Sequence, residues 1–349
     1  MLFLISFGIL LNVSASSVEG LNLYGDNFYF IKRHLTAIIL GAIIFNILKN
    51  LNINFIEKFS SISMVFITTT LFLVLTYGIV VGGSRRWIDL GIVNFQPSEL
   101  AKPLIILWVA KQISNDITED TDLKKFVRSI FLPLLCAFLV LLEPDYGTFA
   151  SICFILFSQI FFSKIKIIYP SLTIFASILP LYFVATSSEY RLSRIETWLS
   201  RKCDLGIDLL GDCFQLNQSR IAISSGGLFG LGPGTSRARW GSLPNSYSDF
   251  ISSIIGEEYG FFGLFLLVLA FFILISTTFL IAIREKNEIK KLISVGFGSW
   301  IFFQTVINLG GAVGIVPITG IVLPFVSYGS SAMISIFIAL GIMYSRDYE

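Results

Sequence analysis

Charged side chains are scarce in this chain of 349 residues: Asp, Glu, Lys and Arg together make up 14% of it. A soluble domain carries about a quarter, so these charges are too few to cover a soluble globule of this size. The net charge of +2 provides no broad basic field, which argues against a nucleic-acid partner. The composition therefore excludes soluble enzymes, disordered regulators and nucleic-acid-binding proteins.

Histidine and cysteine are also rare. The single histidine, His34, excludes a histidine metal cluster and an unaided Ser–His relay. The four cysteines contain no CxxC pair and are too few for a disulfide scaffold, so a zinc site is not expected. Any catalysis must therefore rest on carboxylates, Lys, Arg and hydroxyl groups.

Apolar residues are abundant instead: they make up 54% of the chain, with 34 Phe and a mean hydropathy of +0.80. A helix needs about 20 apolar residues to cross the hydrocarbon core of a membrane. Ten candidate runs lie near residues 1–15, 35–50, 61–82, 97–114, 129–145, 147–163, 167–186, 251–283, 292–312 and 324–345. We therefore predict an all-α, polytopic integral membrane protein with about ten transmembrane helices, forming one domain over 1–349.

The positions of Lys and Arg predict the orientation. With the N-terminus in the cytoplasm, the cytoplasmic segments hold 13 of these cations and the short outer loops hold 4. The positive-inside rule then places both termini in the cytoplasm and puts one large loop, about 187–250, outside. A loop of this length is uncommon unless it is functional or disordered, and its Trp, Phe and Leu content argues against disorder.

This outer loop contains Cys203 and Cys213. A disulfide is chemically permitted outside the cytoplasm. It would close a loop of about 11 residues and contribute roughly 3 kcal/mol in the chain-entropy model. Whether the two cysteines are joined stays open at the level of the sequence.

The outer loop ends at Asp249, directly before a long apolar run. A carboxylate at the membrane surface is partly desolvated, which suits a general base, although Asp is also favoured as a helix N-cap. Glu257 and Glu258 follow within the same run. Acids inside a span usually mark a function; the alternative is that both lie in water-exposed first turns.

A second polar cluster surrounds Trp87. We expect a short interfacial helix there, with Trp87 as anchor, followed by a span that carries Glu99 and Lys102. These two residues are three apart and can pair with each other. Alternatively, Arg86 and Lys102 face an anionic group, in particular phosphate, at the outer surface.

Two further segments are rich in glycine, proline or acids. Glu143-Pro144-Asp145 joins two spans, and its acids are more often turn or cap residues than ligands. Residues 310–331 hold many Gly and Pro between apolar residues. Gly and Pro that interrupt an apolar segment either allow helices to pack closely or line a cavity.

These clusters together resemble the SEDS family, the bacterial proteins of shape, elongation, division and sporulation typified by FtsW and RodA. The resemblance is carried, in order along the chain, by residues 86–91, 96–102, 218–219, 225–228, 243–250, 257–260 and 323–329. The stretch from Ser299 to the C-terminus is more similar to the division members. The chain departs from the family's usual residues at Glu143, Asn245, Tyr247 and Ser330.

The resemblance implies a peptidoglycan glycosyltransferase that polymerises lipid II at the outer face of the bacterial cytoplasmic membrane, in septal wall synthesis during cell division. It implies Asp249 as the essential catalytic residue, with Arg86 and Lys102 beside the pyrophosphate. Further candidates for binding lipid II are Glu257, Glu258, Gln218 and Ser219. The implied partners are a class B penicillin-binding protein transpeptidase, other division proteins and membrane lipid, with a divalent metal (Mg or Mn) as an open question.

Two other functions fit the sequence. A lipid II flippase would suit ten spans with buried acids and broken helices, but the ionisable residues gather at the outer face rather than the midplane. A non-catalytic division scaffold would tolerate the departures around Asp249. Loss of activity in Asp249→Asn separates the enzyme from both.

Overall fold

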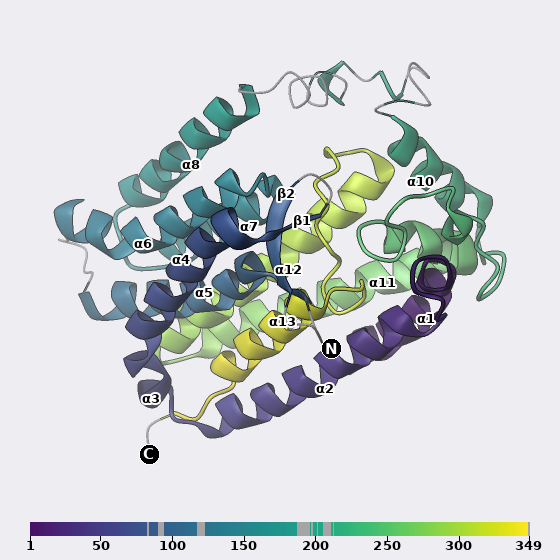
Figure 1. The fold of residues 1–349 in the computed structure, drawn as a ribbon. Coiled ribbons are helices and arrows are strands. Elements are labelled where there is room, and N and C mark those ends of the chain that lie inside the picture. The colour runs from purple at the N-terminus through teal and green to yellow at the C-terminus, as the bar shows by residue number, and fades with distance from the viewer. Residues whose placement is uncertain are drawn as a thin grey trace. The chain divides into compact units, whose positions relative to one another are not determined.

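The structure is a computed structural model, and it describes residues 1–81, 84–89, 94–116, 123–186, 196, 198–200, 202–204, 211 and 213–347. Helices dominate these residues (Figure 1). They are α1 (Leu2–Tyr24), α2 (Tyr29–Asn50), α3 (Ile53–Lys58), α4 (Ser60–Tyr77), α5 (Pro97–Asp116), α6 (Leu123–Leu142), α7 (Tyr146–Phe161), α8 (Ile168–Thr186), α10 (Phe214–Ser225), α11 (Ile251–Arg284), α12 (Glu288–Val313) and α13 (Ser330–Met343), with a short 3-10 helix, η1 (Ala238–Trp240).

Each of the ten apolar runs coincides with a helix, namely α1, α2, α4 to α8 and α11 to α13. Within the described residues, six of these are long and apolar enough to cross a membrane, and α7, α8 and α13 are shorter apolar helices. The all-α prediction is confirmed, and the chain is an integral membrane protein. The number of helices that cross the membrane stays a prediction.

The chain folds into two compact units, each assembled from segments far apart in the sequence. Unit 1 consists of Met1–Thr36, Phe183–Leu274 and Gln304–Gly329. Unit 2 consists of Ala37–Tyr182, Ile275–Phe303 and Ser330–Glu349. Because α2, α8, α11 and α12 each contribute to both units, no point of the sequence separates them.

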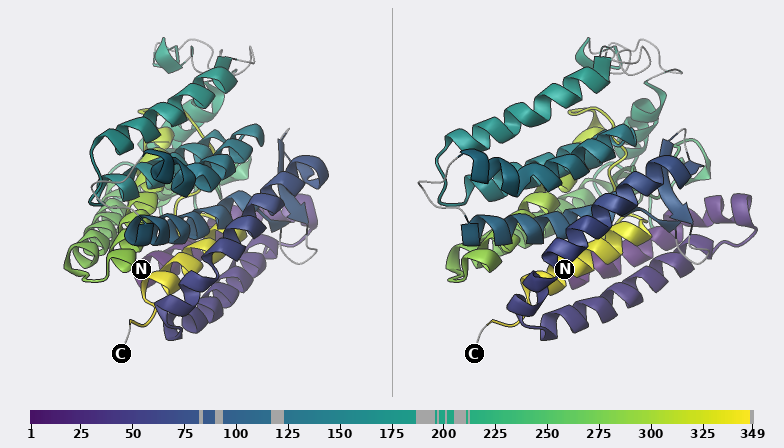
Figure 2. Two further views of the ribbon diagram at one scale, coloured as in Figure 1. Left: turned by 90° about the vertical axis from the view of Figure 1, so that its left-hand side faces the viewer. Right: turned by 60° about the vertical axis from the view of Figure 1, so that its left-hand side comes forward.

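In unit 2, α5 is the central helix and packs against α4, α6, α7 and α13 (Figure 2). It begins at Pro97, a residue favoured at the first helical position because its missing N–H needs no partner there. Gln159 of α7 donates its side-chain amide to the carbonyl oxygens of Ile106 and Leu292, both at 3.0 Å. This buried amide ties α7 to α5 and α12.

The expected interfacial helix around Trp87 is wrong. The segment forms β1 (Ile79–Val81), β2 (Ser84–Asp89) and β3 (Asn94–Phe95), three antiparallel strands in the order β1-β2-β3. Ile79 pairs with Trp87, and Ile88 pairs with Phe95. Ile, Val and Trp favour strands because their side chains pack well on a pleated surface. This preference explains why the segment forms strands rather than the predicted helix.

Two expected helix boundaries are also wrong. The first run extends beyond residue 15 to Tyr24, where Gly25 ends the helix with a left-handed φ of 68°. The last run is helical only from Ser330, because the residues before it form a segment without regular structure. The large loop contains α10 and η1, and the structure joins Cys203 and Cys213 in a disulfide.

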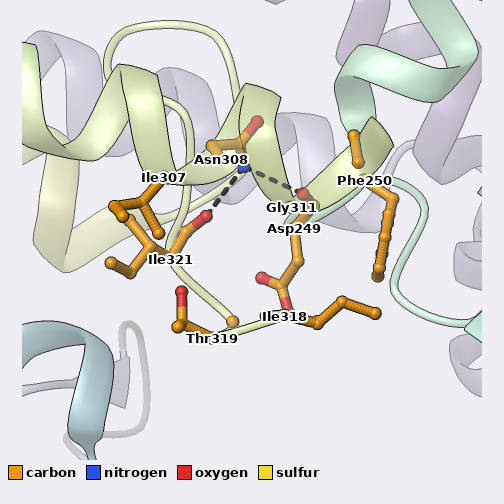
Figure 3. A pocket seen from close by; sticks show the side chains of 10 residues that line it. Asp249, Phe250, Ile307, Asn308, Gly311, Ile318, Thr319 and Ile321 are labelled. Carbon is orange, nitrogen blue, oxygen red and sulfur yellow. Dashed lines mark hydrogen bonds between the residues drawn. The ribbon is translucent and has the colours of Figure 1, made fainter. Parts of the chain in front are cut away.

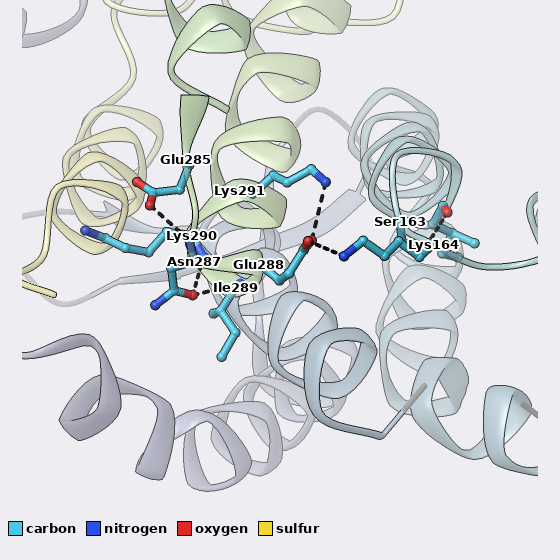
Figure 4. A network of polar contacts seen from close by, with 9 residues as sticks. Ser163, Lys164, Glu285, Asn287, Glu288, Ile289, Lys290 and Lys291 are labelled. Carbon is cyan, nitrogen blue, oxygen red and sulfur yellow. Dashed lines mark hydrogen bonds and ion pairs between the residues drawn. The ribbon is translucent and has the colours of Figure 1, made fainter. Parts of the chain in front are cut away.

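A polar network holds the turn between α11 and α12 in unit 2 (Figure 4). Glu288 pairs with Lys164 at 2.8 Å and with Lys291 at 3.3 Å. The Asn287 side chain accepts hydrogen bonds from the backbone N–H groups of Ile289 and Lys290, which lie in the first turn of α12. The Lys164–Glu288 pair joins the turn after α7 to the first residue of α12, two places that the Lys and Arg positions assign to the same side of the membrane.

Candidate active site

Asp249 lies in unit 1, two residues before the first residue of α11, and its side chain is half-buried. It lines a small pocket with a volume of about 10 Å³, roughly the space that one water molecule needs. The carboxylate points toward the segment that carries Ile318 and Thr319 (Figure 3). The remaining lining residues are Phe250, Ile307, Asn308, Gly311, Ala312, Gly320 and Ile321.

Three hydrogen bonds fix the backbone around Asp249. Asn308 of α12 donates its side-chain amide to the Asp249 carbonyl oxygen at 2.8 Å. The Ser327 hydroxyl donates to the Ser248 carbonyl oxygen at 2.5 Å, and the Tyr328 N–H donates to the Tyr247 carbonyl oxygen at 3.1 Å. The segment 247–249 is therefore held by α12 and by residues 327–328, both remote in sequence.

A local turn presents Asp249 to the pocket. Asn245 has a φ of 56°, a left-handed conformation that Asn adopts more readily than most residues. Its carbonyl oxygen accepts the N–H groups of Ser248, Asp249 and Phe250 at 3.1–3.4 Å. Leu243 and Phe250, on either side of this turn, are buried in an apolar cluster that anchors it.

Glu257 and Glu258 are 2% and 1% exposed, so the alternative of water-exposed first turns is wrong. Glu257 accepts hydrogen bonds from the Ser236 hydroxyl at 2.6 Å and from the N–H groups of Arg237 and Ala238 at 3.0 and 3.2 Å. These internal donors account for its burial, because a buried charge needs such partners. Its predicted contact with lipid II stays a prediction.

Glu258 bonds to a different part of unit 1. Its carboxylate accepts a hydrogen bond from the Ser14 hydroxyl at 2.6 Å. Arg239 also donates to that hydroxyl, at 3.2 Å. Glu258 thus ties α11 to α1 and to the 236–239 segment, and its predicted role toward lipid II likewise stays a prediction.

The Gly-rich segment 226–232 packs on a break in α11. Gly260 has φ 66° and ψ −162°, which are not helical. The backbone groups released there pair with the segment: Leu231 and Gly232 donate to the carbonyls of Glu257 and Glu258, and Phe261 donates to Gly227. These bonds satisfy groups that the broken helix leaves unpaired.

Ser219 and Gln218 lie on α10. The Ser219 hydroxyl donates to the Ala312 carbonyl oxygen at 2.6 Å and lies 2.7 Å from the Ser253 hydroxyl. Ser219 therefore links α10 to α11 and α12 in unit 1. Gln218 is half-buried on the same helix, and its predicted contact with lipid II stays a prediction.

Arg86 and Lys102 both lie in unit 2. Arg86 donates from Nε to the Glu143 carbonyl oxygen at 3.1 Å and from Nη2 to that of Pro144. Lys102 is 0% exposed; its Nζ lies 2.6 Å from Glu99 Oε1 and 4.8 Å from the centre of the Trp300 ring. Glu99 and Lys102 thus form the ion pair that their spacing permits.

The two acids of Glu143-Pro144-Asp145 have different surroundings. Asp145 is the N-cap of α7: it accepts the Thr148 N–H at 3.1 Å and the Gln96 side-chain amide at 3.2 Å. Glu143 directly follows the last residue of α6, and its side chain is buried. Burial raises the pKa of Glu143 to about 9; the neighbouring Asp145 charge adds to this shift and Arg86 opposes it.

Comparison with known proteins decides the family. The model of the FtsW/RodA/SpoVE family, described as "Cell cycle protein", matches residues 1–349. The chain belongs to the FtsW/RodA/SpoVE family. The resemblance seen in the sequence motifs is confirmed, and it covers both units.

Several relatives are similar to this FtsW/RodA/SpoVE chain over most of its length. The probable peptidoglycan glycosyltransferase FtsW of Wigglesworthia glossinidia brevipalpis is 32% identical, over 98% of this chain and 90% of that protein. The protein of the same name from Buchnera aphidicola subsp. Schizaphis graminum is 34% identical, over 97% and 96%. Stage V sporulation protein E of Bacillus subtilis is 32% identical, over 99% and 95%.

Solved structures share the fold. RodA, the rod shape determining protein of Thermus thermophilus, is 25% identical with a TM-score of 0.69, over 98% of this chain and 93% of that one. A chain from a study of how a peptidoglycan synthase complex coordinates polymerization and crosslinking is 25% identical with a TM-score of 0.76, over 98% and 95%.

Three residues of the candidate site are not identified as site residues by the sequence analysis. Asn308 and Thr319 line the Asp249 pocket, and Ser236 binds Glu257. Asn308 lies within the stretch from Ser299 onward that is similar to the division members, and a polar residue inside an apolar helix is a general signal of function. Ser236 and Thr319 lie in irregular segments, where their residue types carry no such signal.

A divalent metal finds no ready ligand set in the described part of the chain. No group of three or more His, Cys, Asp or Glu side chains is placed there to hold an ion. Mg²⁺ and Mn²⁺ favour oxygen ligands at octahedral positions. Because Mg²⁺ is commonly held by only one or two carboxylates together with substrate phosphates, the need for a divalent metal stays an open question.

Proposed function

We propose that this FtsW/RodA/SpoVE chain is a peptidoglycan glycosyltransferase that polymerises lipid II into glycan strands. The observation that carries the proposal is the half-buried Asp249 carboxylate in a pocket whose walls are held by Asn308 and Ser327. The FtsW names of the relatives from Wigglesworthia and Buchnera support it.

Asp249 acts as the general base. Its carboxylate accepts the proton of the acceptor sugar's 4-hydroxyl while that oxygen forms a bond to the anomeric carbon of the donor. The bond from this carbon to the lipid pyrophosphate breaks, and the pyrophosphate leaves with the electron pair. A base held in place accelerates such a step by about 10² to 10⁴-fold.

The leaving pyrophosphate needs cations, and Arg86 and Lys102 are the proposed ones. Arg86 suits this role because its planar guanidinium matches phosphate oxygens. Lys102 starts from the ion pair with Glu99, so its part requires the substrate to compete with that carboxylate. Both residues lie in unit 2.

The biological setting is also proposed. Both termini lie in the cytoplasm, the 187–250 loop and Asp249 face outward, and the enzyme acts at the division site with a class B penicillin-binding protein transpeptidase and other division proteins. The structural relative from a complex that coordinates polymerization and crosslinking supports such a pairing.

The deciding experiment compares the wild-type chain with Asp249→Asn in polymerisation of purified lipid II, with and without a class B transpeptidase. Asn keeps the size of the side chain but does not take up the proton, so we expect glycan synthesis to fall at least about 100-fold. Thermal unfolding in detergent checks that the variant is folded.

The control is Asp26→Asn, which removes an exposed carboxylate of unit 1 that pairs with Lys32. This variant should polymerise lipid II like the wild type. Full polymerisation by Asp249→Asn would exclude Asp249 as the base. Transport of lipid II across vesicles without polymerisation would instead favour a flippase, and complementation of a deletion by Asp249→Asn a scaffold.

A further inference from the structure

The Asp249 pocket has two walls that come from different parts of the chain. One wall is Asp249 itself, at the start of α11, and the other is the segment 318–321 that follows α12. Figure 3 shows the Asp249 carboxylate and the Thr319 side chain on opposite sides of the space between these walls.

In the second wall, the residue after Thr319 is Gly320, which has no side chain. Gly320 has a φ of 73°, and a Cβ at this position would lie 3.5 Å from Asp249 Oδ2. A larger side chain would be strained in this left-handed conformation and would fill the space in front of the carboxylate. Glycine at this position therefore lets the segment lie close to the Asp249 carboxylate, with Thr319 as the neighbouring residue.

Asn308 bridges the two walls. Its side-chain nitrogen donates to the Asp249 carbonyl oxygen at 2.8 Å and to the Ile321 carbonyl oxygen at 2.8 Å. An amide NH₂ has two hydrogens, so both are used. Because Asn308 is 5% exposed, these two bonds are shielded from water and fix the separation of the walls.

We propose that Asn308 is a positioning residue that holds Asp249 against the segment 318–321, and that the acceptor sugar lies outside the pocket and points hydroxyl groups toward Asp249 and Thr319. The proposal rests on the proposed function. Thr319 contacts a hydroxyl next to the one that Asp249 deprotonates, as a hydroxyl side chain can both donate and accept a hydrogen bond. Asn308 acts through the backbone of Asp249 and does not touch the substrate.

The first test is Thr319→Val, which keeps the shape and removes the hydroxyl. We expect the KM for lipid II to rise about 5 to 10-fold, the effect of one lost hydrogen bond, with a smaller change in kcat. Thr319→Ser keeps the hydroxyl and should restore most of the affinity. An unchanged KM in Thr319→Val would remove Thr319 from the site.

The second test is Asn308→Ala, matched by Asn12→Ala. Asn12 is also a buried asparagine of unit 1 whose amide bridges two carbonyl oxygens, those of Gly8 and Val326, at 2.8 and 2.7 Å. Both variants should lose similar thermal stability, because each loses the same kind of contact. Only Asn308→Ala should lose kcat, by about 100-fold, as expected when a reacting group shifts by about 1 Å.

The outcomes separate this inference from the proposed function. If the wild type polymerises lipid II and Asp249→Asn does not, but Asn308→Ala and Asn12→Ala retain equal kcat, the positioning role is overturned and the proposed function stands. If the wild type makes no glycan with its partner present, the proposed function fails first. A loss of kcat in Asn308→Ala beyond that of the equally destabilised Asn12→Ala supports the inference.

Discussion

Buried carboxylates in this chain differ in how their charge is balanced. Glu257 receives three hydrogen bonds from Ser236, Arg237 and Ala238, and Lys102 neutralises Glu99. Both side-chain oxygens of Glu143, in contrast, have no hydrogen-bond partner within the described residues. At the scale of the residue, an unpartnered buried carboxyl group is more stable when protonated.

This difference predicts a pH-dependent stability. The pKa of Glu143 rises from 4.5 to about 9 on folding, because its burial penalises the charged form. The folded chain thus holds a proton that the unfolded chain releases above pH 4.5, so the contribution of Glu143 to stability declines as the pH rises from about 4.5 to about 9.

Glu143→Gln, which is neutral at every pH, should therefore raise the Tm at pH 8 and leave it nearly unchanged at pH 4.5. The expected gain at pH 8 is on the order of a few kcal/mol. Thermal unfolding in detergent across this pH range measures it. Equal Tm values for the wild type and the variant at pH 8 would mean that Glu143 is not held protonated.

Helix α11 is interrupted at Gly260, where its own backbone hydrogen-bond pattern is broken. The segment 226–232 pairs with the released backbone groups. The approach is so close that a Cβ on Gly226 would lie 1.9 Å from the Gly256 carbonyl oxygen, and one on Gly230 would lie 2.1 Å from that of Glu258. At the scale of the element, the backbone of segment 226–232 supplies the hydrogen-bond partners that the broken helix lacks.

Two neighbouring glycines allow the steric cost of an added methyl group to be compared with the cost of a left-handed backbone conformation. Gly226 has an ordinary φ of −75° but no room for a Cβ, whereas Gly227 has a φ of 56° with open space around it. Gly226→Ala should therefore lower the free energy of unfolding by about 3 kcal/mol, the upper end of the usual cost of overpacking, because the clash is with backbone atoms.

Gly227→Ala should cost only about 1–2 kcal/mol for its left-handed conformation. Comparison of the two Tm values provides the measurement, because both changes add the same methyl group. A larger loss in Gly227→Ala would show that the segment does not pack on the α11 break as described.

At the scale of the whole molecule, Lys and Arg are distributed unevenly between the segments that the proposed topology places on the two sides of the membrane. The proposed topology places 13 Lys and Arg in cytoplasmic segments and 4 in short outer loops. The ion pair of Lys164 with Glu288 joins the turn after α7 to the first residue of α12, two places that this topology assigns to the same side. Such a bias sets the orientation of a membrane protein because cationic loops are retained in the cytoplasm.

This topology predicts the outcome of reporter insertions. Alkaline phosphatase, which is active only outside the cytoplasm, should be active when inserted at Gly241, an exposed position with open space around it. The same enzyme fused to the C-terminus should be inactive. High activity of the C-terminal fusion, with normal expression, would contradict the orientation.

The sequence by itself determined the class of the protein and the places of its main helices. Length and apolar content are local properties, so all ten runs are found as helices. The sequence also indicates Asp249 as a candidate base, because a carboxylate at the membrane surface is partly desolvated; that role stays a prediction. The helix predicted around Trp87 was wrong, because the segment is rich in residues that favour strands.

Only the tertiary structure decided what surrounds these residues. Asn308 reaches Asp249 across 59 residues of sequence, and Ser327 reaches Ser248 across 79; neither contact leaves a periodic signal in the chain. The same holds for Glu257, whose donors come from an irregular segment. Side-chain hydrogen bonds between remote segments depend on how the helices pack, so the walls of the pocket become visible only in the folded molecule.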